Sequence, residues 1–478
     1  MGRFGVTILM AIVLAGLGAY LYFVELPSER EQEAQEEQAK QILPFDENQI
    51  TGLTVKTGDS AVVIESGSPG SWRITDPIQT QADRKEVEGL LRALIVGKVS
   101  RVVTEEAPSL APFGLDPPSV SLTVTAGERA ETLSLGDTGP ISSTLYALRE
   151  SDRRVLLTDL KAQDFLNKTL RALRDKSVVA IKEHLVERLR LRYPPTEIVL
   201  YRAQDAQDRK WMIRFPVETE ADQPEVRNLL LRLEDLQALG FIDHGPKHDA
   251  LWAKLDRIKD PPIRIVAHAK GQDQTVRFVQ LDPASGEAYA ITSQNKPIYL
   301  VNPMALQALN KDLFTLRSKR LLGVSADQIA MLHVKTREQD YTLINQNGTW
   351  ILEDAPTQPV DQVQANLFVS RVADLPAELR VVKRPGPLAP YGLASPTAEF
   401  TATVTEGRQS GRLVLGDQAG GLVYAMGQGL PGLYQARSLI LSQIPKKEDL
   451  QQHAAAGERG VPPSASPPPA APTGPGAP

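Results

Sequence analysis

The sequence predicts an α+β protein: an N-terminal transmembrane helix followed by three tandem homologous repeats, each a mainly antiparallel sheet with packed helices. The first observation is the spacing of Trp72, Trp211 and Trp350, since 211 − 72 and 350 − 211 are both 139. The second is an aspartate 11 residues after each tryptophan, which begins a stretch of apolar residues at helical spacing. The third is the alternation of apolar and polar residues in nearby short segments, which is typical of antiparallel strands with one covered face.

The three aspartates predict helix starts. An acidic or amide residue three positions later completes the pattern of a capping box, in which two main-chain amides are satisfied reciprocally by the two side chains. The pairs are Asp83 and Glu86, Asp222 and Glu225, and Asp361 and Gln364. The apolar stripes that follow are Val87, Leu90, Leu91 and Leu94; Val226, Leu229, Leu230 and Leu233; and Ala365, Phe368, Val369 and Val372. Each repeat therefore places an amphipathic helix on a core.

Residues 1–27 predict a membrane anchor. The stretch 4–24 is uncharged and apolar, and about 20 such residues suffice for a helix to cross a bilayer. A cleaved signal peptide is the alternative, but the apolar run continues through residues 20–24, so an uncleaved span is favoured. Arg3 precedes the span and glutamates follow it. We therefore expect a single-pass protein of the cytoplasmic (inner) membrane, with a cytoplasmic N-terminus and its bulk in the periplasm or otherwise extracytoplasmic.

Residues 28–47 predict a charged helical spacer, and residues 48–183 the first α+β repeat. In the first repeat we expect strands at 52–56, 61–65, 72–75, 99–104, 119–125, 131–135, 145–148 and 154–157, and a second helix at 162–173.

The second repeat is expected at 184–323 and the third at 324–447. A string Leu173-Arg174-Asp175-Lys176 closes the first repeat, and Leu316-Arg317-Ser318-Lys319 closes the second, 143 residues later. Residues 448–478 are rich in Ala and Pro and predict a disordered tail.

Composition excludes several classes of function. The formal net charge is −5 and no basic block appears along the chain, which argues against nucleic acid as a partner. The absence of cysteine excludes disulfides, thiolate catalysis and cysteine-based metal sites. The common phosphate-binding, hydrolase, zinc-protease and dinucleotide motifs do not occur in the sequence.

The remaining motifs favour structural roles. The strings Leu135-Gly136-Asp137 and Leu415-Gly416-Asp417 suggest turns rather than metal carboxylates, and the turns at Phe113-Gly114 and Tyr391-Gly392 suggest corners. The tryptophans alternate with apolar residues, so a core role is favoured over a sugar-binding platform.

The only local set of metal-type ligands is His244 and His248 with Asp243 and Asp249. Gly245 and Pro246 lie between the two histidines and oppose a helix that would place both on one face, so a solvated loop is favoured over a zinc site. We expect no catalytic, cofactor-binding or metal-binding residues.

The order of these motifs resembles the bacterial family catalogued as domain of unknown function 4340. Residues that carry the resemblance are Trp72, Pro77, Asp83, Phe113-Gly114-Leu115, Leu135-Gly136-Asp137, Tyr146-Ala147 and Leu173-Arg174-Asp175-Lys176. The resemblance spans about residues 48–447, although the middle repeat has Lys254-Leu255-Asp256 where the aromatic turn would be. It implies a single-span envelope protein associated with gliding-motility-type ABC transporter components, and it supplies no catalytic residues.

These observations favour a non-catalytic, membrane-anchored scaffold or binding protein that is accessory to an ABC-type transport or envelope-assembly complex. Its partners would be the bilayer, through the N-terminal helix, and transporter permease or auxiliary subunits. Two alternatives stay open: an envelope enzyme that acts on glycans through a site in a diverged repeat or between repeats, and a carrier of an apolar solute or lipid.

Overall fold

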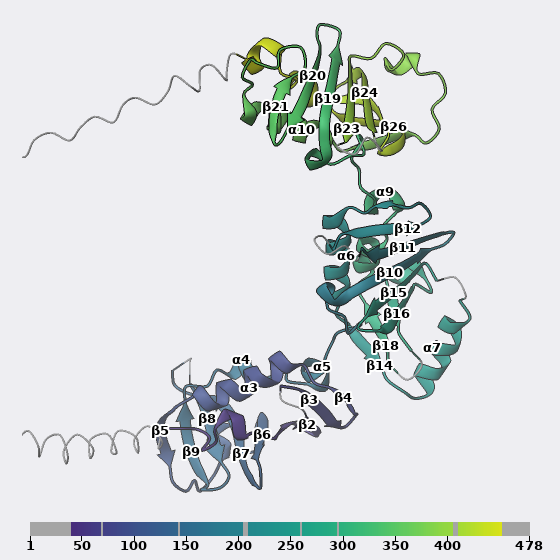
Figure 1. Cartoon of the computed structure of the whole chain (residues 1–478). Coiled ribbons are helices and arrows are strands. Elements are labelled where there is room, and N and C mark those ends of the chain that lie inside the picture. Colours follow the sequence, from purple (N-terminus) through teal and green to yellow (C-terminus); the bar gives the residue numbers. More distant parts are fainter. Residues whose placement is uncertain are drawn as a thin grey trace, which may run out of the picture. The chain divides into compact units, whose positions relative to one another are not determined.

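The computed structural model describes residues 40–67, 70–141, 144–203, 209–258, 261–293, 296–404 and 410–451 (Figure 1). The expected membrane span, most of the expected spacer and the tail from residue 452 onward lie outside these ranges. Within the described ranges, no helix has both the length and the apolar character that crossing a bilayer requires.

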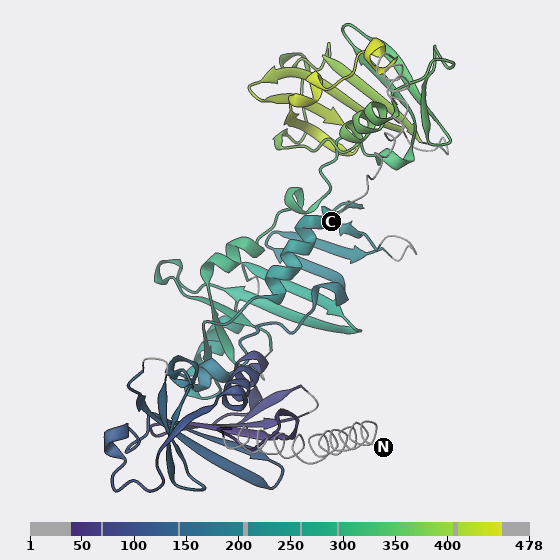
Figure 2. The same ribbon diagram turned by 90° about the vertical axis from the view of Figure 1, so that its left-hand side faces the viewer.

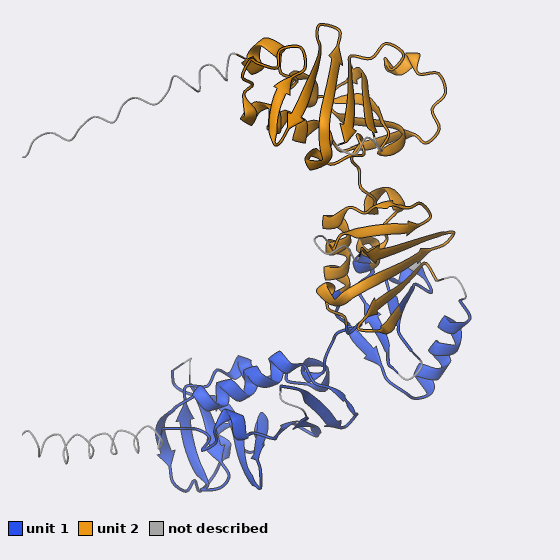
Figure 3. Ribbon diagram, in the orientation of Figure 1, with its two compact units in different colours: residues 1–180, 234–259, 276–305 blue, residues 181–233, 260–275, 306–478 orange. Residues whose placement is uncertain are grey.

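The chain divides into two compact units (Figure 3). One comprises residues 1–180, 234–259 and 276–305, and the other residues 181–233, 260–275 and 306–478. The second repeat therefore contributes strands to both units.

The first repeat folds as an antiparallel sheet with helices. Its strands are β1 (Gly52–Thr57), β2 (Ser60–Ser66), β3 (Trp72–Asp76), β4 (Thr80–Gln81), β5 (Val99–Thr104), β6 (Val120–Ala126), β7 (Arg129–Thr138), β8 (Leu145–Arg149) and β9 (Arg154–Thr158). Its α-helices are α3 (Arg84–Val96), α4 (Ala162–Phe165) and α5 (Leu170–Leu173). In the described residues the strand order is β4-β3-β2-β1-β6-β7-β8-β9-β5, so the strand after α3 pairs at the far edge.

The second repeat has the same plan. Its strands are β10 (Val186–Tyr193), β11 (Thr196–Arg202), β12 (Trp211–Phe215), β13 (Thr219–Glu220), β14 (Gly240–Ile242), β15 (Ile263–Ala269), β16 (Gln272–Val279), β17 (Ala288–Ile291) and β18 (Ile298–Val301). Its helices are α6 (Gln223–Glu234), α7 (Pro246–Asp256), α8 (Pro303–Leu309) and α9 (Leu313–Leu316). The order β13-β12-β11-β10-β15-β16-β17-β18-β14 repeats that of the first sheet.

The third repeat follows the plan with one fewer described strand. Its strands are β19 (Ile329–Thr336), β20 (Asp340–Gln346), β21 (Thr349–Leu352), β22 (Leu379–Val382), β23 (Ala398–Val404), β24 (Ser410–Ala419), β25 (Leu422–Gly427) and β26 (Leu430–Arg437), with α10 (Gln362–Ala373) and α11 (Leu439–Ser442). The described order is β21-β20-β19-β23-β24-β25-β26-β22. Three antiparallel α+β repeats are thus confirmed.

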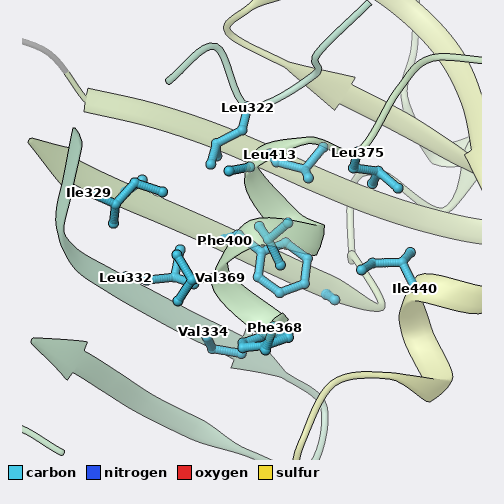
Figure 4. Close-up of a cluster of buried hydrophobic side chains, with 14 of the residues drawn as sticks. Leu322, Ile329, Leu332, Val334, Phe368, Val369, Leu375, Phe400, Leu413 and Ile440 are labelled. Carbon is cyan, nitrogen blue, oxygen red and sulfur yellow. The ribbon is translucent and has the colours of Figure 1, made fainter. Parts of the chain in front are cut away.

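The tryptophans and the helix stripes form the cores. Trp72, Trp211 and Trp350 are 8%, 4% and 2% exposed, so the core role is confirmed. The predicted stripe of each long helix is buried, and Figure 2 shows the helix of the second repeat lying along one face of its sheet. In the third repeat, Phe368 and Val369 of α10 pack against Phe400 of β23 (Figure 4).

The capping prediction is half right. Asp83, Asp222 and Asp361 each accept a hydrogen bond from the amide of the third residue after them, at 3.3, 3.2 and 3.0 Å. The reciprocal half is not formed, because the amide of each aspartate donates to a leucine carbonyl at the end of its own repeat. These pairs are Asp83 with Leu173, Asp222 with Leu316 and Asp361 with Leu450, at 2.8, 2.8 and 3.0 Å. A contact distant in sequence has replaced a local one.

Two other expectations are corrected. The single helix expected over 162–173 is two short helices, because Asn167 adopts a left-handed conformation (φ 66°) that ends α4, and Thr169 caps α5. The loop expected around His248 is the helix α7, because Pro246 at its first turn has a φ that suits a helix start.

Candidate functional site

The Leu-Arg-x-Lys string joins each repeat to the next. In the first string the leucine carbonyl receives the Asp83 amide, and Lys176 Nζ donates to Asp83 Oδ2 at 3.2 Å, so both residues fasten the helix start of their own repeat. In the second string, Lys319 Nζ donates to Asp222 Oδ2 at 2.6 Å. The string is therefore structural in both places.

The arginine of the string points forward along the chain. Arg174 is 4% exposed; its Nη1 donates to Asp243 Oδ2 at 3.0 Å, and its guanidinium lies 3.8 Å from the centre of the Phe241 ring. Asp243 and Phe241 lie in or beside β14, in the same compact unit as Arg174. Arg317 Nη2 likewise donates to the carbonyl of Gly429 at 3.4 Å in the third repeat. Burial lowers the pKa of Arg317 from its ordinary value.

Main-chain pairing completes each joint. The Ala238 amide donates to the Lys176 carbonyl and the Ala377 amide to the Lys319 carbonyl, both at 2.8 Å. The Val99 amide donates to the Lys40 carbonyl at 2.7 Å, so the segment before the first repeat contacts the first repeat as Lys176 contacts the second and Lys319 the third. After Leu450 the chain reads Gln451-Gln452-His453, without the arginine.

An ion pair between a lysine and a glutamate occurs in the first two repeats, and both of its residues are replaced in the third. Lys168 Nζ donates to Glu86 Oε2 at 2.7 Å, and Lys311 Nζ donates to Glu225 Oε2 at 3.3 Å. In the third repeat the equivalent residues are Gln364 and, five residues before Leu450, Pro445. Glu86 and Glu225 therefore have a structural role.

The aromatic-glycine turn and the Leu-Gly-Asp turn pack on each other. A Cβ on Gly136 would lie 2.1 Å from the Phe113 carbonyl oxygen, and a Cβ on Gly114 (φ 65°) would lie 2.4 Å from the Asp137 carboxyl carbon. The Phe113 ring meets Tyr146 of β8 edge-on, with centroids 5.1 Å apart. The third repeat reproduces these contacts at Gly416 and Gly392, with the same ring distance between Tyr391 and Tyr424. The structure thus supports the turn interpretation of both strings.

The histidine cluster is packed into the second repeat. His248 is buried and stacks on Trp252 with ring centres 5.8 Å apart, and its ring nitrogens contact Asp249 Oδ1 and the Lys296 carbonyl at 3.1 and 3.3 Å. His244 lies against it, with ring centres 4.5 Å apart. In the part of the chain that the structure describes, no group of three or more His, Cys, Asp or Glu residues could hold a metal ion.

The candidate site is a groove of about 710 Å³ on the solvent face of the second sheet. It is lined by five arginines and two carboxylates: Arg188, Arg190, Arg192, Arg214, Arg264, Glu197 and Asp273. We call this surface the arginine face. All of its residues belong to one compact unit.

Strand register brings these arginines together. Positions 188, 190 and 192 of β10 are exposed and alternate with buried Leu189 and Leu191, so all three side chains leave the same side of the sheet. On the neighbouring strand β15, His268 lies opposite Arg188, and Arg264 lies opposite Arg192. Arg214 of β12 reaches over the Tyr201 ring at 5.7 Å.

Only part of this charge is neutralised. Arg190 Nε lies 3.4 Å from Glu197 Oε1, and His268 Nδ1 lies 2.6 Å from Asp273 Oδ1. Within the described ranges, Arg188, Arg214 and Arg264 have no carboxylate partner within 4.0 Å, and Arg264 Nε is buried without a hydrogen-bond acceptor. Such groups suit phosphate or carboxylate oxygens, which the planar guanidinium binds with two parallel hydrogen bonds.

The same face is nearly neutral in the other repeats. Strand pairing identifies the residues of the other repeats that are equivalent to Arg188, Arg190, Arg192 and Arg264. In the first repeat they are Gly52, Thr54, Lys56 and Ser121, and in the third they are Met331, His333, Lys335 and Glu399. Hydroxyl pairs cover it in the first repeat, as at Thr123 and Thr132 (2.8 Å). In the third repeat, carboxylates lie beside its basic side chains, as Asp340 lies 2.6 Å from His333 and Glu399 lies 2.6 Å from Arg412.

Sequence reasoning missed the arginine face. The cations of β10 alternate with apolar residues in the string Arg188-Leu-Arg-Leu-Arg192, so no basic block forms, and Arg214 and Arg264 join them only through register. Counting charge at every second residue of each predicted strand would have found the three on β10.

Comparison with known proteins agrees with the internal repeat. A family model described as domain of unknown function (DUF4340) matches residues 72–257, 211–379 and 350–452. Each match begins at one of the three tryptophans. No curated protein and no solved structure matches the chain. The chain therefore belongs to the DUF4340 family and carries three copies of its domain.

Proposed function

We propose that this chain is a non-catalytic scaffold that presents three DUF4340 repeats on the extracytoplasmic side of the membrane, as an accessory to an ABC-type transport or envelope-assembly complex. The N-terminal apolar stretch would anchor it to the inner membrane. Transporter permease or auxiliary subunits would be its protein partners.

The observation that carries the proposal is what the repeats have in common. All three share the buried tryptophan and the capping aspartate, and the first two also share the Leu-Arg-x-Lys joint. Each of these features contributes to folding or to joining repeats. The same main-chain hydrogen bond, from the Ala238 amide to Lys176 and from the Ala377 amide to Lys319, recurs at both joints, and a repeated linking contact of this kind suits a scaffold. Catalytic groups, in contrast, are expected to have perturbed environments in a cleft.

Neither alternative gains support from the groove described above. An enzyme acting on glycans by acid–base chemistry would place two facing carboxylates across a cleft. A carrier of an apolar solute would have an apolar lining. The arginine face has five arginines in its lining, and its two carboxylates, Glu197 and Asp273, lie 3.4 Å from Arg190 and 2.6 Å from His268.

Crosslinking in intact cells tests the proposal. The full-length chain with a C-terminal affinity tag is crosslinked, captured from solubilised membranes, and the retained proteins are identified. We expect the subunits of one ABC transporter or envelope-assembly complex to be retained. In the matched control, residues 1–27 are replaced by a cleaved signal peptide, and this retention is expected to be lost. Recovery of the chain without any such subunit would overturn the proposal.

A further inference from the structure

The arginine face concentrates like charge where the fold does not need it. Arg264 lies directly opposite Arg192, and within the described residues neither Arg188 nor Arg264 has a carboxylate partner within 4.0 Å. The first and third repeats build the same sheet with Ser121 or Glu399 in place of Arg264. The charge therefore requires an explanation other than folding.

We propose that the arginine face binds a linear acidic glycan, that is, a sugar polymer whose carboxylate or phosphate groups recur along its length. The inference does not depend on the transporter partnership proposed above. It rests on charge complementarity, on the spacing of the arginines and on the shape of the groove.

The spacing suits a polymer with repeated anions. Side chains on one face of a strand are about 6.7 Å apart, so Arg188, Arg190 and Arg192 present a row of cations along β10. Arg264 extends the row onto the neighbouring strand β15, and Arg214 lies on β12, beyond β11 on the other side of β10. An extended polymer lying in the groove can bind several of these guanidinium groups at once, whereas a single small anion can bind only one or two.

Shape and neighbouring groups favour a glycan over other anions. A flat bilayer would reach the rim of a groove rather than its floor. An acidic peptide usually adds a strand to a sheet edge, but β10 and β15 are paired on both sides. Nucleic acid prefers a series of exposed aromatic rings for its bases, and the exposed ring in this lining is Phe215, which is 51% exposed. A sugar ring has an apolar face that can pack on the Phe215 ring, while the acidic groups beside it bind the arginines.

The test measures binding of defined polymers to the full-length chain in neutral detergent. The probes are polygalacturonate, neutral dextran, oligodeoxythymidylate and glycerol phosphate. Polygalacturonate is expected to bind with an affinity that falls steeply as salt is raised, and dextran is expected not to bind. Glycerol phosphate, the headgroup anion of an acidic lipid, is expected to displace it only at far higher concentration.

Two variants with equal charge change locate the site. In the face variant, Arg188→Gln, Arg190→Gln and Arg264→Gln are expected to weaken polygalacturonate binding at least about tenfold and to reduce its salt dependence. In the control variant, Arg92→Gln, Arg227→Gln and Arg371→Gln remove three exposed helix arginines, and binding is expected to stay within about twofold of the wild type.

Other outcomes overturn the inference. Equal weakening in both variants would show a response to net charge alone, and no weakening in the face variant would place binding elsewhere. Tighter binding of oligodeoxythymidylate than of polygalacturonate would assign the face to nucleic acid. Displacement by glycerol phosphate at matched anion concentration would assign it to single anions or lipid headgroups.

A stability measurement separates binding from misfolding. In the third repeat, Glu399 lies opposite Lys335, and Arg264→Glu would place a glutamate opposite Arg192 in the same way. We therefore expect this variant to have an equal or higher melting temperature and to lose binding. A lower melting temperature would instead assign Arg264 a structural role and overturn the inference.

Discussion

The second repeat differs from the first and third in two places, and the differences are of opposite kinds. It lacks the interlocked glycine turns, with α7 and Lys254-Leu255-Asp256 in the region of the aromatic-glycine corner, and it has gained the arginine face. It nevertheless keeps the tryptophan, the cap and the joint of its neighbours. The fold thus tolerates replacement of a corner and of a whole sheet face, provided that the helix start and the joints remain.

This comparison separates two kinds of information. Residues shared by all three repeats specify folding, and residues peculiar to one repeat are where a partner is to be sought.

The largest effect is expected at a shared core position. Trp211→Ala removes a buried ring and should lower the free energy of unfolding by about 3–5 kcal/mol, as judged by urea denaturation. Phe215→Ala on the same strand is the control, and its exposed ring predicts little change. Equal losses in the two variants would contradict the core assignment.

The glycine turns should be nearly as sensitive. Gly136→Ala forces a Cβ against the Phe113 carbonyl oxygen, and overpacking of this kind costs about 1–3 kcal/mol. Gly89→Ala in α3 has open space around its Cβ and should instead stabilise the protein by about 0.5–1 kcal/mol. Thermal melts of the two variants should therefore shift in opposite directions.

The joint predicts a loss of coupling between repeats. Arg174→Gln breaks the hydrogen bond to Asp243, and charged hydrogen bonds contribute about 1.5–3 kcal/mol. Unfolding of the first repeat should become less cooperative with that of the second, as followed by hydrogen exchange. Gln451→Ala alters the equivalent residue at the end of the third repeat and should change nothing. A uniform loss of protection across all repeats would argue against a local joint.

Loss of a cap should be a smaller effect. Asp83→Ala removes the bonds to the helix amides and is expected to cost on the order of 1 kcal/mol. The variant Lys176→Met leaves the cap intact and removes the ion pair to Asp83 together with the hydrogen bond from Nζ to the Ala172 carbonyl, partly exposed contacts that should contribute less. If Lys176→Met proved the more damaging, the cap would not be the main role of Asp83.

The smallest effect at neutral pH concerns buried tyrosines. Burial raises the pKa of Tyr193 and of Tyr341 well above the usual value of 10, because a phenolate inside the fold loses its hydration. The folded state therefore disfavours the ionised form. Stability should be unchanged below about pH 10 and fall as the pH rises further. Tyr193→Phe should reduce that alkaline loss, as measured by melts at pH 8 and above pH 10.

The sequence predicted the features that depend on regular spacing. The repeats and their helices were predicted from three tryptophans, three apolar stripes that each follow an aspartate, and the alternation of apolar and polar residues within strands. These patterns can be read from the sequence because buried positions recur at the period of a helix or a strand. The broken helix at Asn167 and the helix α7 were missed because their cause is local: one left-handed residue, and one proline start with few buried side chains.

The candidate site could not be predicted from spacing alone. Arg264 lies opposite Arg192, 72 residues away in the sequence, only because β15 pairs with β10. The closing bond from the Asp83 amide to Leu173 likewise joins distant residues and displaced the local capping box. Sheet pairing decides both, and a single sequence does not specify which strands pair.

The most direct test compares stability and glycan binding in the face variant of the full-length chain. If shared residues fold the protein and the arginine face serves a partner, the urea midpoint should equal or exceed that of the wild type while polygalacturonate binding weakens at least about tenfold. A midpoint that falls together with the affinity would contradict the separation of folding from binding.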